Sequence, residues 1–425
     1  MRTFPSPSLS LARQLDAEDP LAASRKEFIA PGTGAVNDIY FLGNSLGLQP
    51  RRTRDYIQQV LDDWSSLGVE SFFHAREPWM DYHQKLVGPL SVITGSKESE
   101  IVVMNQLTVN LHLLLAGFYR PAGKKFRILC EAKAFPSDQY AFETHVRHRG
   151  FDPAEAIIEV SPRTGEHLLR TEDVLQAIRE HKDELALLLL GGLNYYTGQV
   201  LDMEAITREA QHHGILTGFD LAHAVGNISL QLHDWGVDFA CWCSYKYLNA
   251  GPGAVGGVFI HERHHQAGTP RLAGWWGYEA ETRFRMEKGF KPMRGAEGWQ
   301  LSTPSILLYA SLHASLQIFA EAGWNKIQDK RQLLNDFLWA VLGNAFAENT
   351  NADVEIITPI DPAWRGCQVS LLLSKNGKLL FDRLSSLGIR TDWREPNVIR
   401  FAPVPLYNSF EEVYLLGEAM KEFKF

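Results

Sequence analysis

Short, mostly apolar runs alternate with longer amphipathic stretches between about residue 70 and residue 310. The runs cover 101–104, 126–130, 185–190, 215–219, 239–243 and 255–260. Their lengths are typical of strands that are buried on both faces. Helical spacing lies between several of them, as in 109–118 and 203–213. Buried strands that alternate with helices form mostly parallel sheets, so the pattern predicts an α/β fold.

The chain has 425 residues, which is more than a single hydrophobic core usually supports. We expect residues 70–310 to form a large α/β domain. In residues 311–425 the regular alternation ends, and helical stretches and shorter strands follow, which predicts a smaller α+β domain. Residues 1–69 read as an arm that contributes to this small domain, with helices expected over 16–28 and 52–67.

Charge and composition exclude several classes of protein. The net charge of −8 argues against a nucleic-acid partner, which usually meets a basic face. The longest apolar run, 185–190, is too short to span a membrane. Four cysteines are too few for a disulfide scaffold, so we expect a cytoplasmic protein. His261, His264 and His265 cluster without a matching ligand pattern, and we expect a solvated turn there and no metal.

Two charged residues follow neighbouring apolar runs. Asp220 ends the run at 215–219, and Lys246 comes shortly after the run at 239–243. Ligands of parallel sheets bind beyond the carboxyl ends of the strands, where both residues would lie. A pyridoxal phosphate (PLP) enzyme needs a lysine that forms a Schiff base and an acid that pairs with the pyridine nitrogen. The alternatives are a helix cap for Asp220 and a surface lysine at 246.

Further polar and aromatic residues occur at the same kind of position. Thr108 stands between a strand and a helix, where it would hold a phosphate or cap the helix. Phe135, Pro136, Ser137 and Asp138 follow the run at 126–130, and the phenyl ring would stack on a cofactor or pack in the core.

Residues beside the acid and the lysine are also candidates. His223 lies one helical turn beyond Asp220. Tyr245 would bind the phosphate or act as an acid, with simple strand packing as the alternative. Arg400 lies in an apolar strand, where its fork of donors suits a substrate carboxylate or an ion pair within the protein. For Trp275 and Thr303, core packing is the simplest reading of the residues alone.

Several segments together resemble the kynureninase family of PLP enzymes. They are 40–48, with Asn44 and Ser45, then 106–112, 135–138, 220–227, 233–249 and 402–409. They occur in order between about residues 38 and 415. The resemblance implies the aspartate-aminotransferase type of fold, with a mostly parallel sheet between helices and a smaller α+β domain. It also implies a homodimer with the active site at the interface.

By matching motif, the resemblance implies a role for each candidate. Leu107 and Thr108 would contact the cofactor phosphate, Phe135 would stack on the ring, and Pro136, Ser137 and Asp138 would share that loop. Asp220 would bind the pyridine nitrogen with support from His223, Tyr245 would reach the phosphate, and Lys246 would form the Schiff base. Trp275 and Thr303 would complete the site from the neighbouring subunit, and Arg400 and Ser45 would bind the substrate. Some relatives have asparagine in place of Thr303 and serine in place of Gly191.

The activity that the resemblance implies is hydrolysis of the Cβ–Cγ bond of L-kynurenine or its 3-hydroxy form. The products are L-alanine and anthranilate or 3-hydroxyanthranilate, in tryptophan breakdown or NAD synthesis. Two other classes stay open: another enzyme on this fold, such as a cysteine desulfurase or an aminotransferase, and an inactive binding protein. A desulfurase needs a mobile nucleophilic cysteine, and only Cys367 comes into question. Retention of both Lys246 and Asp220 speaks against an inactive protein.

Overall fold

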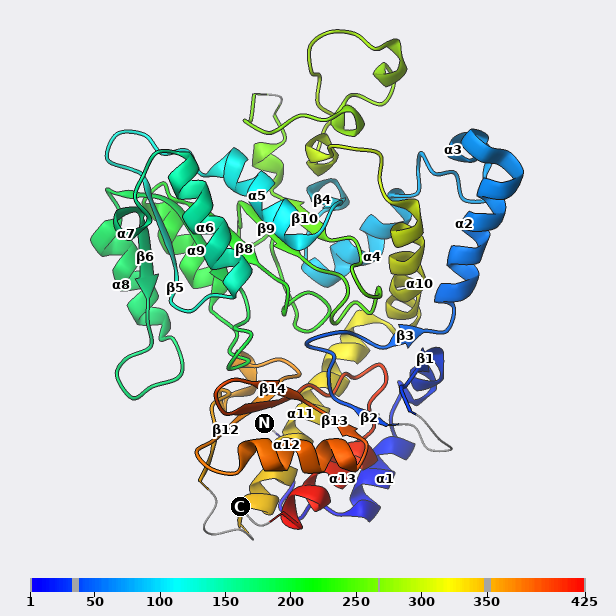
Figure 1. The fold of residues 1–425 in the computed structure, drawn as a ribbon, viewed down its shortest axis with the longest axis vertical. Helices are drawn as coiled ribbons and strands as arrows, with labels where there is room; N and C mark the ends of the chain where they lie inside the picture. The colour runs from blue at the N-terminus through cyan, green and yellow to red at the C-terminus, as the bar shows by residue number, and fades with distance from the viewer. Residues whose placement is uncertain (1, 33–37, 267, 348–352, 424–425) are drawn as a thin grey trace.

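A seven-stranded sheet is the centre of the larger part of the computed structural model, which describes residues 2–32, 38–266, 268–347 and 353–423 (Figure 1). In spatial order the strands are β4 (Ile101–Val103), β10 (Gly257–Ile260), β9 (Phe239–Trp242), β8 (Leu216–Asp220), β7 (Leu185–Gly191), β5 (Arg127–Glu131) and β6 (Ile157–Val160). Strand β10 runs antiparallel to both of its neighbours, and the other neighbouring pairs are parallel. The predicted α/β class with a mostly parallel sheet is confirmed.

Helices cover both faces of this sheet because its central strands are apolar on both sides. Leu187 and Leu189 of β7 pack in the cluster that includes α5 (Leu107–Phe118) and α6 (Pro136–His148). Leu188 and Leu190, the alternate residues of the same strand, pack in the cluster of the opposite face. That face carries α4 (Gln84–Thr94), α8 (Thr171–His181), α9 (Met203–His212) and α10 (Ile306–Ala322). Strand β6 was not predicted, because this edge strand is only partly buried and has no continuous apolar run.

A second, antiparallel sheet lies in the lower part of Figure 1. Its strands, in order, are β11 (Val354–Ile356), β12 (Val369–Leu373), β15 (Val398–Phe401) and β14 (Asp392–Arg394). Three helices accompany it in the same hydrophobic cluster: α11 (Trp324–Ala347), α12 (Gly377–Ser386) and α13 (Phe410–Lys421). The short strand β13 (Ile389–Arg390) pairs with β2 (Ile39–Tyr40), which ties the N-terminal arm to this sheet.

The predicted helix over 16–28 is wrong. Helix α1 (Leu9–Ala17) begins after Ser8, whose hydroxyl accepts the amide hydrogen of Leu11, and it packs against α13. Pro20 has no amide hydrogen and disfavours helical backbone before it, so the helix ends and a 3-10 segment, η1 (Ala22–Glu27), follows. Strand β1 (Phe28–Ile29) then pairs with β3 (Gln49–Pro50).

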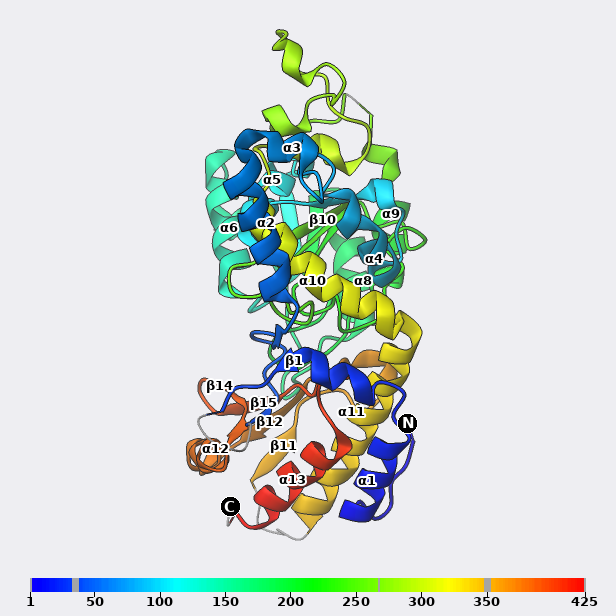
Figure 2. The same cartoon turned by 90° about the vertical axis from the view of Figure 1, so that its right-hand side faces the viewer.

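The predicted helix over 52–67 is confirmed as α2 (Thr53–Leu67), and α3 (Ser71–His74) follows it. Helix α2 lies along α10, as both views show (Figures 1 and 2). Residues 268–295 project from the end of the molecule opposite the second sheet and contain the short turns η5 (Trp275–Gly277) and η6 (Arg283–Arg285) (Figure 2). Within the described ranges, no helix combines the length and the apolar character needed to cross a membrane.

Candidate active site

A cavity of about 290 Å³ opens at the carboxyl ends of β5, β7 and β8, beside the loop that follows β9. Its walls consist of Gln106, Leu107, Thr108, Glu131, Phe135, Ser137, Asp138, Gly191, Leu193, Tyr195, Asp220, Ala222, His223, Tyr245 and Lys246. Parallel strands end together at this edge, which brings residues far apart in the chain into one wall. Most of the residues expected in the site therefore lie around a single cavity.

Five expected residues lie outside these walls. Pro136 is the first residue of α6, where its missing amide hydrogen costs nothing. Ser45 and Arg400 contact one acid, Asp392, behind the cavity. Trp275 and Thr303 lie on segments outside the cavity walls, and the Trp275 ring packs against Phe284 instead.

Asp220 is a buried carboxylate that is fixed by its own backbone. One of its oxygens accepts the amide hydrogen of Ala222 at 2.7 Å. Burial raises the pKa of Asp220, and burial and the nearby Asp220 charge raise the pKa of Asp138 well above its usual range. The pKa of Asp138 is raised further than that of Asp220, so Asp138 is the acid that takes a proton shared between the two. The Oδ1 atom of Asp138 is buried and has no hydrogen-bond partner.

Glu131 is a third buried acid in the same cavity, and the sequence analysis missed it. Both of its carboxyl oxygens accept the amide hydrogen of Gly191, at 3.1 and 3.0 Å. Burial raises the pKa of Glu131 to about 7. A Cβ atom at position 191 would lie 2.8 Å from a Glu131 oxygen, so the glycine leaves room for the carboxyl group. The signal was available, because Glu131 ends an apolar run just as Asp220 does.

The amine of Lys246 lies 2.8 Å from Nε2 of His223. The same nitrogen is 5.9 Å from the ring centres of Phe135 and of Tyr245. Burial, followed by the charge of Lys246, lowers the pKa of His223 well below its usual value, so the imidazole is neutral. Its Nδ1 atom is buried without a partner. Burial also raises the pKa of Tyr245, whose hydroxyl faces the Cys243 thiol.

The first turn of α5 has exposed amide groups at the rim of the cavity. Gln106, which precedes the helix, gives no side-chain cap to these amides. Thr108 is the second residue of this helix and lines the cavity. Uncapped amides at a helix start bind anions, so this corner suits a phosphate group better than a structural cap.

The walls fit PLP group by group. The uncapped start of α5 suits the phosphate, and the Lys246 amine suits the aldehyde. The buried Asp220 carboxylate suits a protonated pyridine nitrogen, which would give its charge a cationic partner, and Asp138 lies next to it. The Phe135 ring stands where a flat cofactor ring would pack.

The four cysteines do not provide a nucleophile for desulfurase chemistry. Cys130, Cys241, Cys243 and Cys367 are all free and buried. Burial raises the pKa of the Cys367 thiol to about 12, which keeps it protonated near neutral pH. Cys367, the cysteine that a desulfurase would use as its nucleophile, is thus neither exposed nor activated.

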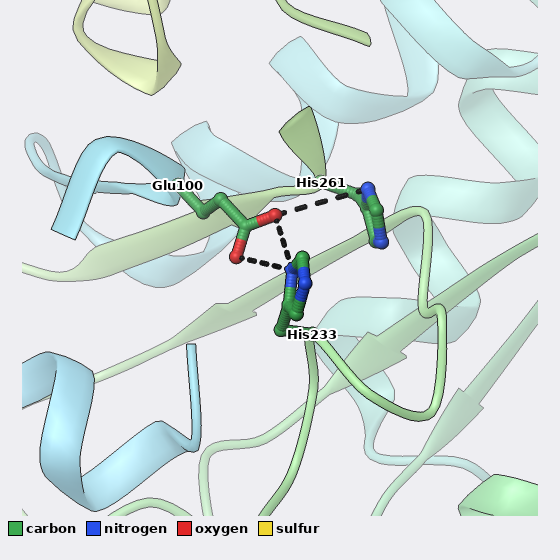
Figure 3. A group of neighbouring side chains, drawn as sticks. All are labelled: Glu100, His233 and His261. Carbon is green, nitrogen blue, oxygen red and sulfur yellow. Dashed lines mark hydrogen bonds and ion pairs between the residues drawn. The ribbon is translucent and has the colours of Figure 1, made fainter. Parts of the chain in front are cut away.

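A separate group, Glu100, His233 and His261, has the residue types of a metal site (Figure 3). It lies at the amino end of β9, away from the cavity at the carboxyl ends of the parallel strands. His261 follows β10, and the last residue of β10 pairs with the first residue of β9. Glu100 accepts from His233 Nδ1 at 2.9 Å, and His261 Nδ1 accepts the amide hydrogen of Arg263 at 3.2 Å. His261 Nδ1 also lies 3.7 Å from a Glu100 oxygen, so the three side chains link the residue before β4, the loop before β9 and the residue after β10.

The chain is similar to proteins of known family along its whole length. Residues 39–354 match the family model of class-V aminotransferases, and residues 327–420 match that of the kynureninase C-terminal domain. A kynureninase of Flavobacterium psychrophilum is 51% identical over 98% of both chains. A kynureninase of Myxococcus xanthus is 50% identical, over 96% of this chain and 95% of its own.

Solved structures with low sequence identity share the fold. The cystine C-S lyase C-DES superposes with a TM-score of 0.75 at 19% identity, over 92% of this chain and 98% of its own. A cysteine desulfurase of Thermococcus onnurineus has a TM-score of 0.75 at 17% identity, over 91% and 94% of the two chains. An alanine–glyoxylate aminotransferase of Nostoc has a TM-score of 0.64 at 16% identity, over 93% and 97%.

Proposed function

Since the chain belongs to the kynureninase family, we propose that it hydrolyses the Cβ–Cγ bond of L-kynurenine or 3-hydroxy-L-kynurenine. The products are L-alanine and anthranilate or 3-hydroxyanthranilate, a step of tryptophan breakdown. The enzyme depends on PLP, as its family does. The observation that carries the assignment of roles is the cavity in which Lys246, Asp220 and the uncapped start of α5 meet.

The proposed roles follow from this geometry. Lys246 binds the cofactor aldehyde covalently, and Asp220, with Asp138 behind it, holds the pyridine nitrogen. Leu107, Thr108 and Tyr245 hold the phosphate, while Phe135 and His223 pack against the ring. When bound, PLP withdraws electrons from the α-carbon of the amino acid and so supplies the electron sink for bond cleavage.

Side chains that face the cavity are the proposed proton donors and acceptors. Once the substrate amine has taken the place of Lys246 on the cofactor, the freed Lys246 amine would remove the proton at Cα and would carry it for return in a later step. The Tyr245 hydroxyl, whose pKa is raised by burial, stays protonated and is the proposed donor in the later steps. Arg400 and Ser45 lie behind Tyr195 and are the proposed contacts of the substrate carboxylate.

The test of the reaction is formation of fluorescent anthranilate from L-kynurenine without any keto acid. A desulfurase or an inactive protein forms none, and an aminotransferase would need the acceptor. Lys246→Ala is the matched negative variant. Competition between L-kynurenine and its 3-hydroxy form then assigns the preferred ring.

We propose that the enzyme is a homodimer in which Trp275 and Thr303 complete the partner's site. Trp275 is 44% exposed and lies beside Phe284 and Phe73, which are 52% and 50% exposed. A cluster of exposed aromatic rings is typical of an interface. Mixed dimers of Lys246→Ala and Trp275→Ala subunits should regain roughly half of the wild-type rate, because one site per dimer is intact. Mixed dimers without activity would contradict the shared site.

Two coarser expectations remain predictions. The four free thiols suit a reducing compartment, which supports a cytoplasmic location. The domain limits at about residues 69 and 310 stay predictions, and separate expression of the two parts would test whether they fold independently.

A further inference from the structure

Arg400 is engaged by an acid of its own chain. The residue lies on β15 and is fully buried. Its guanidinium forms an ion pair with Asp392 and donates to the carbonyl oxygen of Tyr195. Asp392 is the register partner of Arg400 across the β14–β15 pair, so the sheet itself brings the two side chains together.

Asp392 also has partners that would hold it without Arg400. Ser45 donates its hydroxyl to Oδ2 of Asp392 at 3.1 Å. The guanidinium of Arg394 lies 3.4 Å from the same oxygen, and its side chain is 38% exposed. Ser45 is itself a proposed contact of the substrate carboxylate, so Arg394 is the partner that stays available. The acid can therefore leave Arg400 and remain paired with Arg394 at the more exposed side of the sheet.

Arg400 stands directly behind the cavity wall. Tyr195, whose carbonyl oxygen it binds, lines the cavity and packs edge-on against Phe135 with ring centres 5.3 Å apart. The Nε and Nη2 atoms of Arg400 are buried and neither has a hydrogen-bond partner, so the contact of Nη2 with Asp392 is an ion pair without an aligned hydrogen bond. A buried guanidinium with a free donor has capacity for a further oxygen, which a planar carboxylate offers.

We propose that Asp392 takes the place of the substrate carboxylate on Arg400 and yields it when an α-amino acid binds. The proposal rests on the substrate role of Arg400 given above. An unpaired buried guanidinium is costly, so an acid of the protein keeps it paired in the resting enzyme. Exchange of one carboxylate for another conserves that pairing, whereas an amine without a carboxylate cannot displace Asp392. The pair thus selects α-amino acids and weakens the binding of all of them by competition.

The test is binding of two small ligands to the holoenzyme, followed by the visible absorbance of the cofactor. L-Alanine carries the carboxylate, and ethylamine lacks it. In Asp392→Asn the amide is a weaker competitor for Arg400, and L-alanine should bind about tenfold more tightly, equal to about 1.4 kcal/mol. Ethylamine affinity should stay within about twofold, because it never meets Arg400. Weaker or unchanged binding of L-alanine would overturn the proposal and make Asp392 a fixed support of Arg400.

Two further variants test where Asp392 goes and whether its charge alone explains the result. Arg394→Gln removes a partner that receives Asp392, so L-alanine should bind more weakly while ethylamine is unaffected. Asp353→Asn removes an equal charge from the same sheet region, where Asp353 pairs with Lys375 and is exposed, and should change neither affinity. An equal gain in L-alanine affinity in Asp392→Asn and Asp353→Asn would mean a general charge effect and would overturn the exchange.

Failure of the exchange can be separated from failure of the proposed function. In Arg400→Lys the preference for L-alanine over ethylamine should fall sharply, because the planar fork is lost. If the preference survives, Arg400 does not bind the substrate carboxylate. If wild-type enzyme forms no anthranilate, the reaction itself is wrong. If Arg400→Lys loses the preference and the wild-type enzyme forms anthranilate, but Asp392→Asn binds L-alanine no better than the wild type, only the exchange fails.

Discussion

The Lys246 amine and Nε2 of His223 lie 2.8 Å apart at the floor of the cavity. His223 is neutral because burial, and then the charge of Lys246, lower its pKa well below the usual value. A neutral ring nitrogen accepts a hydrogen bond from the amine and so fixes where Nζ points. The histidine thus orients the amine that must meet the cofactor aldehyde.

Replacement of Lys246 by alanine should abolish the covalent hold on the cofactor. Borohydride reduction followed by peptide mapping should label Lys246 in the wild type and no residue in the variant. Turnover should fall by on the order of 10³-fold or more, because the amine that moves the Cα proton is also lost. A label on another lysine, or near-normal turnover, would refute the role of Lys246.

Replacement of His223 should weaken the binding of the cofactor more than it slows the reaction. His223→Leu removes the acceptor for Lys246 and leaves the amine free to adopt other rotamers, so PLP affinity should fall about tenfold. His223→Gln keeps an acceptor and should lose less. Titration of cofactor-free protein with PLP measures both, and equal losses in the two variants would contradict an orienting hydrogen bond.

The two acids at the pyridine end should not be equivalent. Asp220→Asn removes the charge that pairs with the ring nitrogen, and turnover should fall roughly 10- to 100-fold, the worth of a charged hydrogen bond. Asp138 already carries the proton in the pair, so Asp138→Asn keeps a donor toward Asp220 and should cost much less. Steady-state rates at saturating PLP decide this, and a larger loss in Asp138→Asn would reverse the assignment.

The sequence predicts those features that depend on local pattern. The apolar runs locate six of the seven strands of the large sheet, and β6 was missed because it is half exposed. Asp220 and Lys246 were identified because each follows a buried strand of a parallel sheet. Helical spacing over 16–28 predicted a helix that runs through Pro20, whereas the structure has α1 over Leu9–Ala17.

Features that depend on pairing between distant segments were beyond reach. The contact of Glu131 with Gly191 exists only because β5 and β7 are neighbours in the sheet. Arg400 meets Asp392 because of the register of β14 and β15, and no local pattern in the sequence shows that pairing. Tyr195 lies in a turn without periodicity, and no local pattern points to the cavity.

Glu131 should make the stability of the cofactor-free protein fall as pH rises. Its pKa is about 7 in the fold, against an ordinary value of 4.5, because its carboxyl group is buried. The fold therefore favours the protonated acid. That contribution is fully present below pH 4.5 and is lost as pH rises through 7. Relative to Glu131→Gln, the wild type should lose about 3 kcal/mol between pH 4.5 and pH 8.

Urea unfolding of both cofactor-free proteins across this pH range measures the difference. Glu143→Gln alters an exposed acid on α6 and controls for general charge effects, so its difference from the wild type should be nearly constant with pH. A pH-independent difference for Glu131→Gln would mean that Glu131 is ionised throughout, held by the Gly191 amide alone. In that case the acid would add a negative charge beside Asp220, and the cavity would favour a cationic ring still more strongly.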